Sequence, residues 1–179
     1  RMLLPRCRSA SWRDQASMDR ALRWAPRLPM LLAPDPVWQL PRQPWSGGQS
    51  IIVSWRPTPL LDERGWLVLL NALATLAERI DAPVRWLAFH RHQDAPLLQQ
   101  LIDQNLVPPS LISRSTTVVP KSLETVFATV RKARLVIPMR LHALILARLA
   151  CCPMAALSYD PKVEAAAVMA GIPCSTLGA

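Results

Sequence analysis

The chain has little lysine and little acidic charge. Of its 21 basic residues three are Lys, against 12 Asp and Glu, which gives a formal net charge of +9. Such a charge is compatible with nucleic-acid binding. The arginines are scattered, however, with no run of five basic residues and no nucleic-acid-binding motif. We therefore attribute the charge to an arginine-biased composition and predict no nucleic-acid partner. Because lysine is rare in this chain, the presence of Lys162 is more informative than a lysine would be in an average sequence.

Cysteine is also scarce, and long uncharged apolar runs are missing. The four cysteines have neither metal-ligand nor disulfide spacing: Cys7, Cys151, Cys152 and Cys174. This pattern predicts reduced thiols, packing for the adjacent pair and a cytoplasmic location, with peripheral attachment to the inner face of the membrane left open. The longest apolar region, 135–157, is interrupted by ionisable side chains, which argues against a transmembrane segment.

Short apolar segments alternate with helical patterns through most of the chain. Strands are predicted at 51–55, 84–89, 116–119, 134–137 and 154–158, and helices at 65–80, 94–105, 122–132, 141–150 and 161–170. This alternation is typical of an α/β domain of Rossmann type with about five parallel strands. We expect the strands at 51–55, 84–89, 134–137 and 154–158 to end on one edge of a single parallel sheet.

The first 50 residues are rich in proline and are predicted to be irregular, apart from a helix at about 17–23. Asp14 or Ser17 is expected to cap that helix, and Asp35 begins a turn. The Pro- and Gly-rich stretch 41–49 is predicted to be a linker. On residue chemistry alone, Arg13 is a surface charge.

Ionisable and polar side chains follow three of the predicted strands. Arg56 follows the first strand, Arg140 and His142 follow the fourth, and Tyr159 and Lys162 follow the fifth. Parallel strands hand over to helix N-termini at one edge of a sheet, and such an edge suits a phosphate or a carboxylate. The imidazole adds a group that can move a proton near neutral pH. Each residue alone has an ordinary explanation as a cap, a packing residue or a solvated charge, but together they predict an anion site with acid–base chemistry.

A further pair of histidines, His90 and His92, follows the second predicted strand. An H-x-H pattern can bind a metal, but no third ligand is near in the sequence. We interpret the two histidines as polar residues of the loop that follows this strand. We predict neither a metal nor a cofactor.

Two motifs at a defined spacing carry a family resemblance. M-R-L-H-A-L-I-L-A occupies 139–147, S-Y-D-P-K-V begins at Ser158 and G-I-P begins at Gly171. Together they strongly resemble the polysaccharide pyruvyl transferase family. Pro138 is a departure, because the family usually has a small residue, often Gly, at that place; proline removes a backbone donor there.

The resemblance implies an enzyme that forms a ketal, transferring a pyruvyl group from phosphoenolpyruvate to a sugar of a cell-surface polysaccharide or of its lipid-linked precursor. It also implies a two-domain fold like that of GT-B glycosyltransferases, with the active site in the cleft between the domains. Residues 1–48 are then the tail of the first domain and the interdomain linker, and 49–179 are the Rossmann-like C-terminal domain. On this interpretation we expect a fragment truncated at both ends, without its N-terminal domain.

The resemblance also suggests roles for individual residues. Arg140 and Lys162, with Arg13 of an R-D-x-x-S element, are expected to hold the phosphate and carboxylate of phosphoenolpyruvate, while His142 serves as general acid–base. Arg56 and Tyr159 are predicted as further substrate contacts. Two alternatives stay open at this stage: a GT-B glycosyltransferase that uses a nucleotide sugar, and a non-catalytic module that binds an anion or a sugar.

Overall fold

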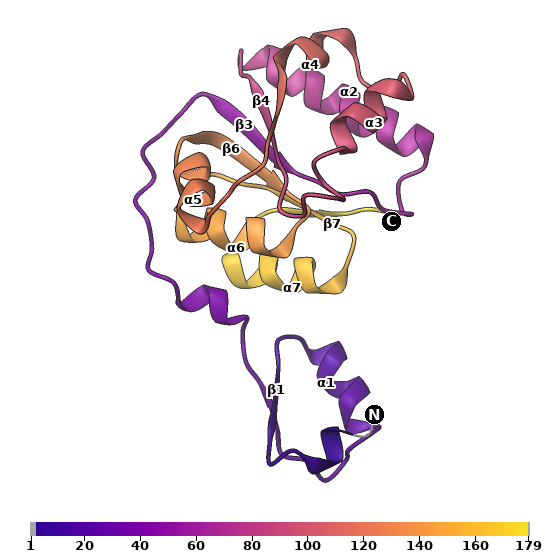
Figure 1. Cartoon of the computed structure of the whole chain (residues 1–179), viewed down its shortest axis with the longest axis vertical. Coiled ribbons are helices and arrows are strands. Elements are labelled where there is room, and N and C mark those ends of the chain that lie inside the picture. The colour runs from indigo at the N-terminus through magenta and orange to yellow at the C-terminus, as the bar shows by residue number, and fades with distance from the viewer. Residues whose placement is uncertain (1–2, 179) are drawn as a thin grey trace. The chain divides into compact units, whose positions relative to one another are not determined.

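The computed structural model describes residues 3–178, and the chain forms two compact units, Arg1–Leu40 and Pro41–Ala179. The first unit contains a short parallel pair of strands joined through a helix (Figure 1). The Asp14 carboxylate caps this helix, accepting from the Ser17 amide at 2.7 Å. The prediction of irregular structure was wrong for the two strands, because three residues are too few to show a strand period. The elements are η1 (Leu4–Arg6), β1 (Ala10–Trp12), α1 (Gln15–Leu22), β2 (Met30–Leu32) and η2 (Pro36–Gln39).

The second unit is built on parallel strands. Four of them form a sheet in the order β5-β4-β3-β6, and the other two form the pair β7-β8. A parallel bridge between Val136 and Met154 places β7 beside β6. The order β5-β4-β3-β6-β7-β8 is that of a Rossmann fold. From β3 the chain adds successive strands toward one side of the sheet, and from β6 it adds them toward the other, so the strand order reverses between β3 and β6. The strands are β3 (Ser50–Ser54), β4 (Val84–Leu87), β5 (Ser115–Val118), β6 (Ala133–Pro138), β7 (Ala156–Ser158) and β8 (Cys174–Thr176).

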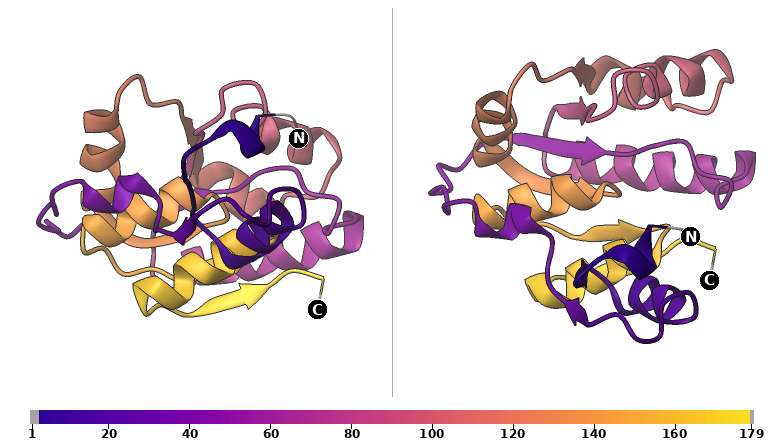
Figure 2. Two further views of the ribbon diagram at one scale, coloured as in Figure 1. Left: turned by 90° about the horizontal axis from the view of Figure 1, so that it is seen from below. Right: turned by 60° about the horizontal axis from the view of Figure 1, so that its bottom comes forward.

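Helices cover both faces of this sheet (Figures 1 and 2). On one face lie α2 (Glu63–Arg79), α3 (Leu97–Asp103) and α4 (Pro109–Arg114), and on the other lie α5 (Leu123–Arg131), α6 (Leu141–Leu149) and α7 (Pro161–Ala170). On the first face, Ile51 and Val53 of β3 and Trp55, which follows β3, pack with apolar side chains of α2 and α3. In α6 seven of nine residues are buried, which explains its nearly continuous apolar sequence. The prediction of an α/β fold with a parallel sheet is confirmed.

Some boundaries differ from the sequence prediction, and one difference matters for the site. The helix predicted at 94–105 begins at Leu97, and Asp94 is buried in the loop between β4 and α3. Its carboxylate accepts hydrogen bonds from a side chain far away in the sequence instead of capping the helix. Two short elements, α4 and β8, were not predicted, because six and three residues carry too little periodicity.

The stretch 41–49 has no regular secondary structure, as expected of a linker, but part of it is tied to the second unit. The Gln43 amide donates to the Leu149 carbonyl at 2.8 Å, and the Trp45 indole donates to the Ala133 carbonyl at 2.9 Å. The guanidinium of Arg131 donates back to the Pro44 carbonyl at 2.8 Å. The segment therefore belongs to the body of the second unit, and the division into domains at 48/49 stays a prediction.

Gly48 lies where this segment crosses the chain after α5. A Cβ at this position would lie 1.8 Å from the carbonyl oxygen of Lys132, which is a backbone atom and cannot rotate away. We expect Gly48→Ala to lower the free energy of unfolding by at least about 2 kcal/mol, as overpacking against a fixed neighbour does. Urea denaturation measures the loss, with Gln49→Ala at an exposed neighbouring position as the control. Equal stability of the two variants would contradict the close approach.

Candidate anion-binding and catalytic site

The structure brings five of the six predicted site residues to the carboxyl edge of the sheet in the second unit. They follow β3, β6 and β7, three strands that lie side by side in the order β3-β6-β7. This edge includes the place where the strand order reverses, and open α/β sheets bind ligands outside the carboxyl ends of their strands at such a point. The five residues are Arg56, Arg140, His142, Tyr159 and Lys162.

Arg56, Tyr159 and Lys162 form one cluster. The Arg56 Nη1 donates to the Tyr159 hydroxyl at 3.2 Å, and its Cζ lies 5.1 Å from the centroid of the tyrosine ring. The Lys162 Nζ lies 6.0 Å from the same centroid. Because β6 lies between β3 and β7, the Arg56 side chain spans the end of β6. The cluster places two cations around one ring, which attracts them through its π face.

Lys162 is the second residue of α7, and its charge is partly balanced by the residue that caps the helix. Asp160 accepts from the Lys162 amide at 3.0 Å through Oδ1, and its Oδ2 lies 2.8 Å from the Lys162 Nζ. Both side chains are about 30% exposed, at 29% and 31%. A bound anion would therefore compete with this carboxylate for the ammonium group.

Arg140 is held at both its backbone and its side chain. The amides of Met139 and Arg140 donate to the Ser54 carbonyl at the end of β3, at 3.0 and 3.3 Å. The guanidinium forms a two-pronged contact with Asp94: Nε donates to Oδ2 at 3.1 Å, and Nη2 donates to Oδ1. The net positive charge at the edge is thus smaller than the sequence suggested, because a carboxylate faces this arginine as well.

His142 lies in the first turn of α6, with its side chain exposed. The side chain of its N-cap residue, Arg140, makes no capping hydrogen bond within residues 3–178. The first amide groups of an uncapped helix need an acceptor, and an anion can provide it. An exposed imidazole beside such amides is therefore placed to exchange a proton with a bound anion.

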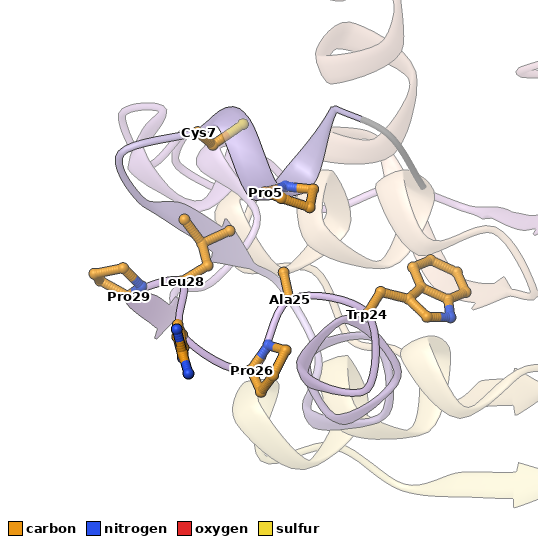
Figure 3. Close-up of a pocket in the computed structure, with 8 residues that line it drawn as sticks. Pro5, Cys7, Trp24, Ala25, Pro26, Leu28 and Pro29 are labelled. Carbon is orange, nitrogen blue, oxygen red and sulfur yellow. The ribbon is translucent and has the colours of Figure 1, made fainter.

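Arg13 lies in the first unit, where its Nη1 is 3.3 Å from the Asp35 Oδ2. Its participation in the site stays a prediction. The same unit has a pocket of about 540 Å³ (Figure 3), but none of the predicted site residues lines it. The lining is mostly apolar and consists of Pro5, Cys7, Trp24, Ala25, Pro26, Arg27, Leu28 and Pro29.

Sequence reasoning missed two polar residues at the edge, Asp94 and Ser54. The sequence predicts a helix that begins at Asp94, and nothing local indicates that this residue meets an arginine 46 positions away. Ser54 ends an apolar strand, and its buried hydroxyl has no hydrogen-bond partner among residues 3–178. Buried hydroxyls normally form a hydrogen bond. The Ser54 hydroxyl is therefore an unsatisfied hydrogen-bonding group next to the point where the strand order reverses.

Other predictions concern the paired histidines, the four cysteines and the possibility of a membrane-spanning helix. The His90 and His92 rings are 6.3 Å apart, and across the described residues no three His, Cys, Asp or Glu side chains are grouped to hold a metal. All four cysteines are free thiols, and burial raises the pKa of Cys152 to about 12. Between residues 3 and 178 no helix combines the length and apolar character needed to cross a bilayer.

The fold and the edge define a Rossmann-type α/β protein whose cationic groups, helix N-terminus and exposed imidazole suit anion binding and proton transfer. A family model described as polysaccharide pyruvyl transferase matches residues 1–161. The chain belongs to the polysaccharide pyruvyl transferase family, which confirms the resemblance seen in its motifs. Membership indicates a transferase of polysaccharide biosynthesis that acts on a saccharide acceptor. A comparison with curated proteins gives no match.

Proposed function

We propose that this protein transfers a pyruvyl group from phosphoenolpyruvate to two hydroxyls of one sugar, in a polysaccharide or its lipid-linked precursor. The observation that carries the proposal is the grouping of Arg56, Arg140, Lys162 and the exposed His142 on adjacent loops of one sheet edge. Phosphoenolpyruvate carries a phosphate and a carboxylate, so its recognition requires several cations in one place. Its conversion also requires a proton donor, and His142 provides one beside them.

The reaction balances without an oxidant or a reductant. A proton adds to the methylene carbon of phosphoenolpyruvate, and the central carbon acquires oxocarbenium character. One sugar hydroxyl forms a C–O bond to that carbon, the bond to the phosphate oxygen breaks, and a second hydroxyl of the same sugar closes the ketal. The two sugar hydroxyls lose one proton each. One of these protons balances the proton added to the methylene group, and the other is taken up by the released phosphate or by solvent. His142 is the proposed proton carrier, either toward the methylene carbon or away from an attacking hydroxyl.

The remaining residues have binding roles in this proposal. Lys162, Arg140 and Arg56 hold the phosphate and carboxylate, and Tyr159 provides the surface against which two of these cations rest. Arg13 is a further proposed substrate-binding residue, as the family resemblance suggests. The second unit is then the C-terminal half of a GT-B-like enzyme that works in the cytoplasm, at the membrane face when its acceptor is lipid-linked. Phosphoenolpyruvate is the donor substrate, and no cofactor is needed.

Two measurements on the whole protein test this proposal. Calorimetric titration with phosphoenolpyruvate should show binding, and addition of a saccharide acceptor should release phosphate. Turnover of a nucleotide sugar without dependence on phosphoenolpyruvate would contradict the proposal and indicate a glycosyltransferase. Binding of phosphoenolpyruvate without phosphate release from any acceptor would indicate a non-catalytic module.

Lys162→Ala tests the anion-binding role directly. It removes a charge-assisted contact that is made in both the ground state and the transition state, so the loss should appear in KM for phosphoenolpyruvate. We expect KM to rise roughly 10–100-fold with little change in kcat, since hydrogen bonds to charged groups contribute about 1.5–3 kcal/mol. Lys121→Ala is the matched control, because that lysine is exposed in the loop after β5. A KM that stays at the wild-type value would remove Lys162 from the site.

A further inference from the structure

Arg140 is anchored to two other segments at the carboxyl edge of the sheet. Its backbone is attached to the end of β3 through the Ser54 carbonyl, and its guanidinium is attached to the loop after β4 through Asp94. Because β3 lies between β4 and β6, the side chain spans the carboxyl end of β3. The arginine is therefore fixed at both ends, across the central strand of the sheet.

Asp94 is fully committed to this contact. Its side chain is 2% exposed, and its Oδ2 accepts both from Arg140 Nε at 3.1 Å and from the His90 amide at 2.8 Å. Its Oδ1 accepts from Arg140 Nη2. A carboxylate buried to this degree must be paired, and the two-pronged contact fixes the plane of the guanidinium as well as its position.

The contact leaves one end of the guanidinium unused by the protein. Nε and Nη2 are occupied by Asp94, and Gln93 also accepts from Nη2 at 3.2 Å. Nη1 makes no hydrogen bond to the residues that the structure describes, and the side chain keeps 17% of its exposure. Two N–H donors in a fixed direction therefore remain at an edge where the charge of the arginine is already balanced.

We propose that Asp94 is a positioning residue for pyruvyl transfer, which orients Arg140 so that Nη1 meets the donor in the transition state. This inference rests on the proposed function and adds to it that Arg140 acts through direction rather than net charge. Removing the Asp94 charge makes the site more positive, so ground-state binding of phosphoenolpyruvate is not weakened. The loss falls on kcat, because small misplacements of an aligned group cost roughly 10²-fold in rate.

The test is a double-mutant cycle in the whole protein, using Asp94→Asn, Arg140→Gln and the combined variant, with phosphate release as the assay. Asp94→Asn should lower kcat about 10–100-fold at an unchanged or lower KM, in line with the cost of misalignment. In the Arg140→Gln background, Asp94→Asn should have no further effect on kcat. The guanidinium that Asp94 orients is absent from that background, so the two substitutions are not additive. Asp81→Asn is the matched control, since Asp81 also pairs with an arginine, Arg114 at 2.8 Å, but is 89% exposed.

Further measurements separate the outcomes. If Asp94→Asn does not fold, Asp94→Glu keeps the charge but displaces the carboxylate by one methylene, and its kcat should fall while its KM holds. The Nε–H signal of Arg140 in nitrogen-15 NMR should be protected from solvent exchange in the wild type and lose protection in Asp94→Asn. An inactive wild type with a protected Nε–H overturns the proposed function alone. An active wild type whose Asp94 variants keep wild-type kcat, or lose it equally in both arginine backgrounds, overturns the positioning role.

Discussion

Replacing His142 with alanine is expected to lower kcat for pyruvyl transfer by roughly 10²–10⁴-fold, the usual contribution of a general acid–base. Phosphoenolpyruvate should still bind with near-normal affinity, because the substitution leaves the cations proposed to hold it, Arg56, Arg140 and Lys162, in place. The exposed side chain of His142 contributes little to the core, so folding should be unaffected. Steady-state kinetics and calorimetry on the purified variant measure the two effects separately.

The matched control is His92→Ala, an exposed histidine in the loop after β4. It should leave kcat within a factor of about two, the range expected for a surface substitution of at most 0.5 kcal/mol. A His142→Ala enzyme with wild-type kcat and an unchanged pH profile would make His142 a surface residue. The proton-transfer role would then belong to another group.

The second large effect is expected on stability, from Arg140→Ala. The variant leaves the Asp94 carboxylate, whose side chain is 2% exposed, without its guanidinium partner. Removing one member of a buried ion pair typically costs about 3–5 kcal/mol, because the remaining charge stays desolvated. We expect a loss at the lower end of that range, since the arginine side chain is 17% exposed and water can reach part of the site. Urea denaturation of the variant measures it.

Two comparisons make this prediction specific. Adding Asp94→Asn to Arg140→Ala should recover much of the lost stability, because it removes the unpaired charge. Arg114→Ala, which breaks the exposed pair with Asp81, should cost less than about 1 kcal/mol, as surface ion pairs do. Similar losses for the two arginine variants would mean that the Asp94 pair behaves as a surface contact.

Much of the fold was predictable because local signals agreed with the tertiary structure. The apolar run of α6 is buried on most sides, and the start and end of α7 follow its caps. Asp160 accepts from the Lys162 amide, and Gly171 ends the helix in the left-handed region at φ 65°. Parallel order followed from the alternation of strands and helices, and with it the collection of Arg56, Arg140 and Lys162 at one edge.

The contacts between those side chains could not be predicted, because they join residues far apart in the sequence. Arg56 and Tyr159 are 103 positions apart, and Arg140 and Asp94 are 46 apart. The sequence indicated the edge where each residue lies but not its partner. It therefore overstated the free positive charge at the site. The strands of the first unit and β8 escaped prediction for a different reason, since their length of three residues shows no period.

The central claim is that the sheet edge with Arg140, His142 and Lys162 transfers an intact pyruvyl group to a saccharide. The most direct measurement incubates the whole protein with phosphoenolpyruvate labelled with carbon-13 in its carboxylate, together with a saccharide acceptor, and follows the label by mass spectrometry and NMR. The account predicts that the label appears in a ketal on the saccharide, with one phosphate released for each label transferred, and that His142→Ala nearly abolishes both. Label that remains in phosphoenolpyruvate or appears as free pyruvate, while the saccharide is unchanged or glycosylated from a nucleotide sugar, would contradict it.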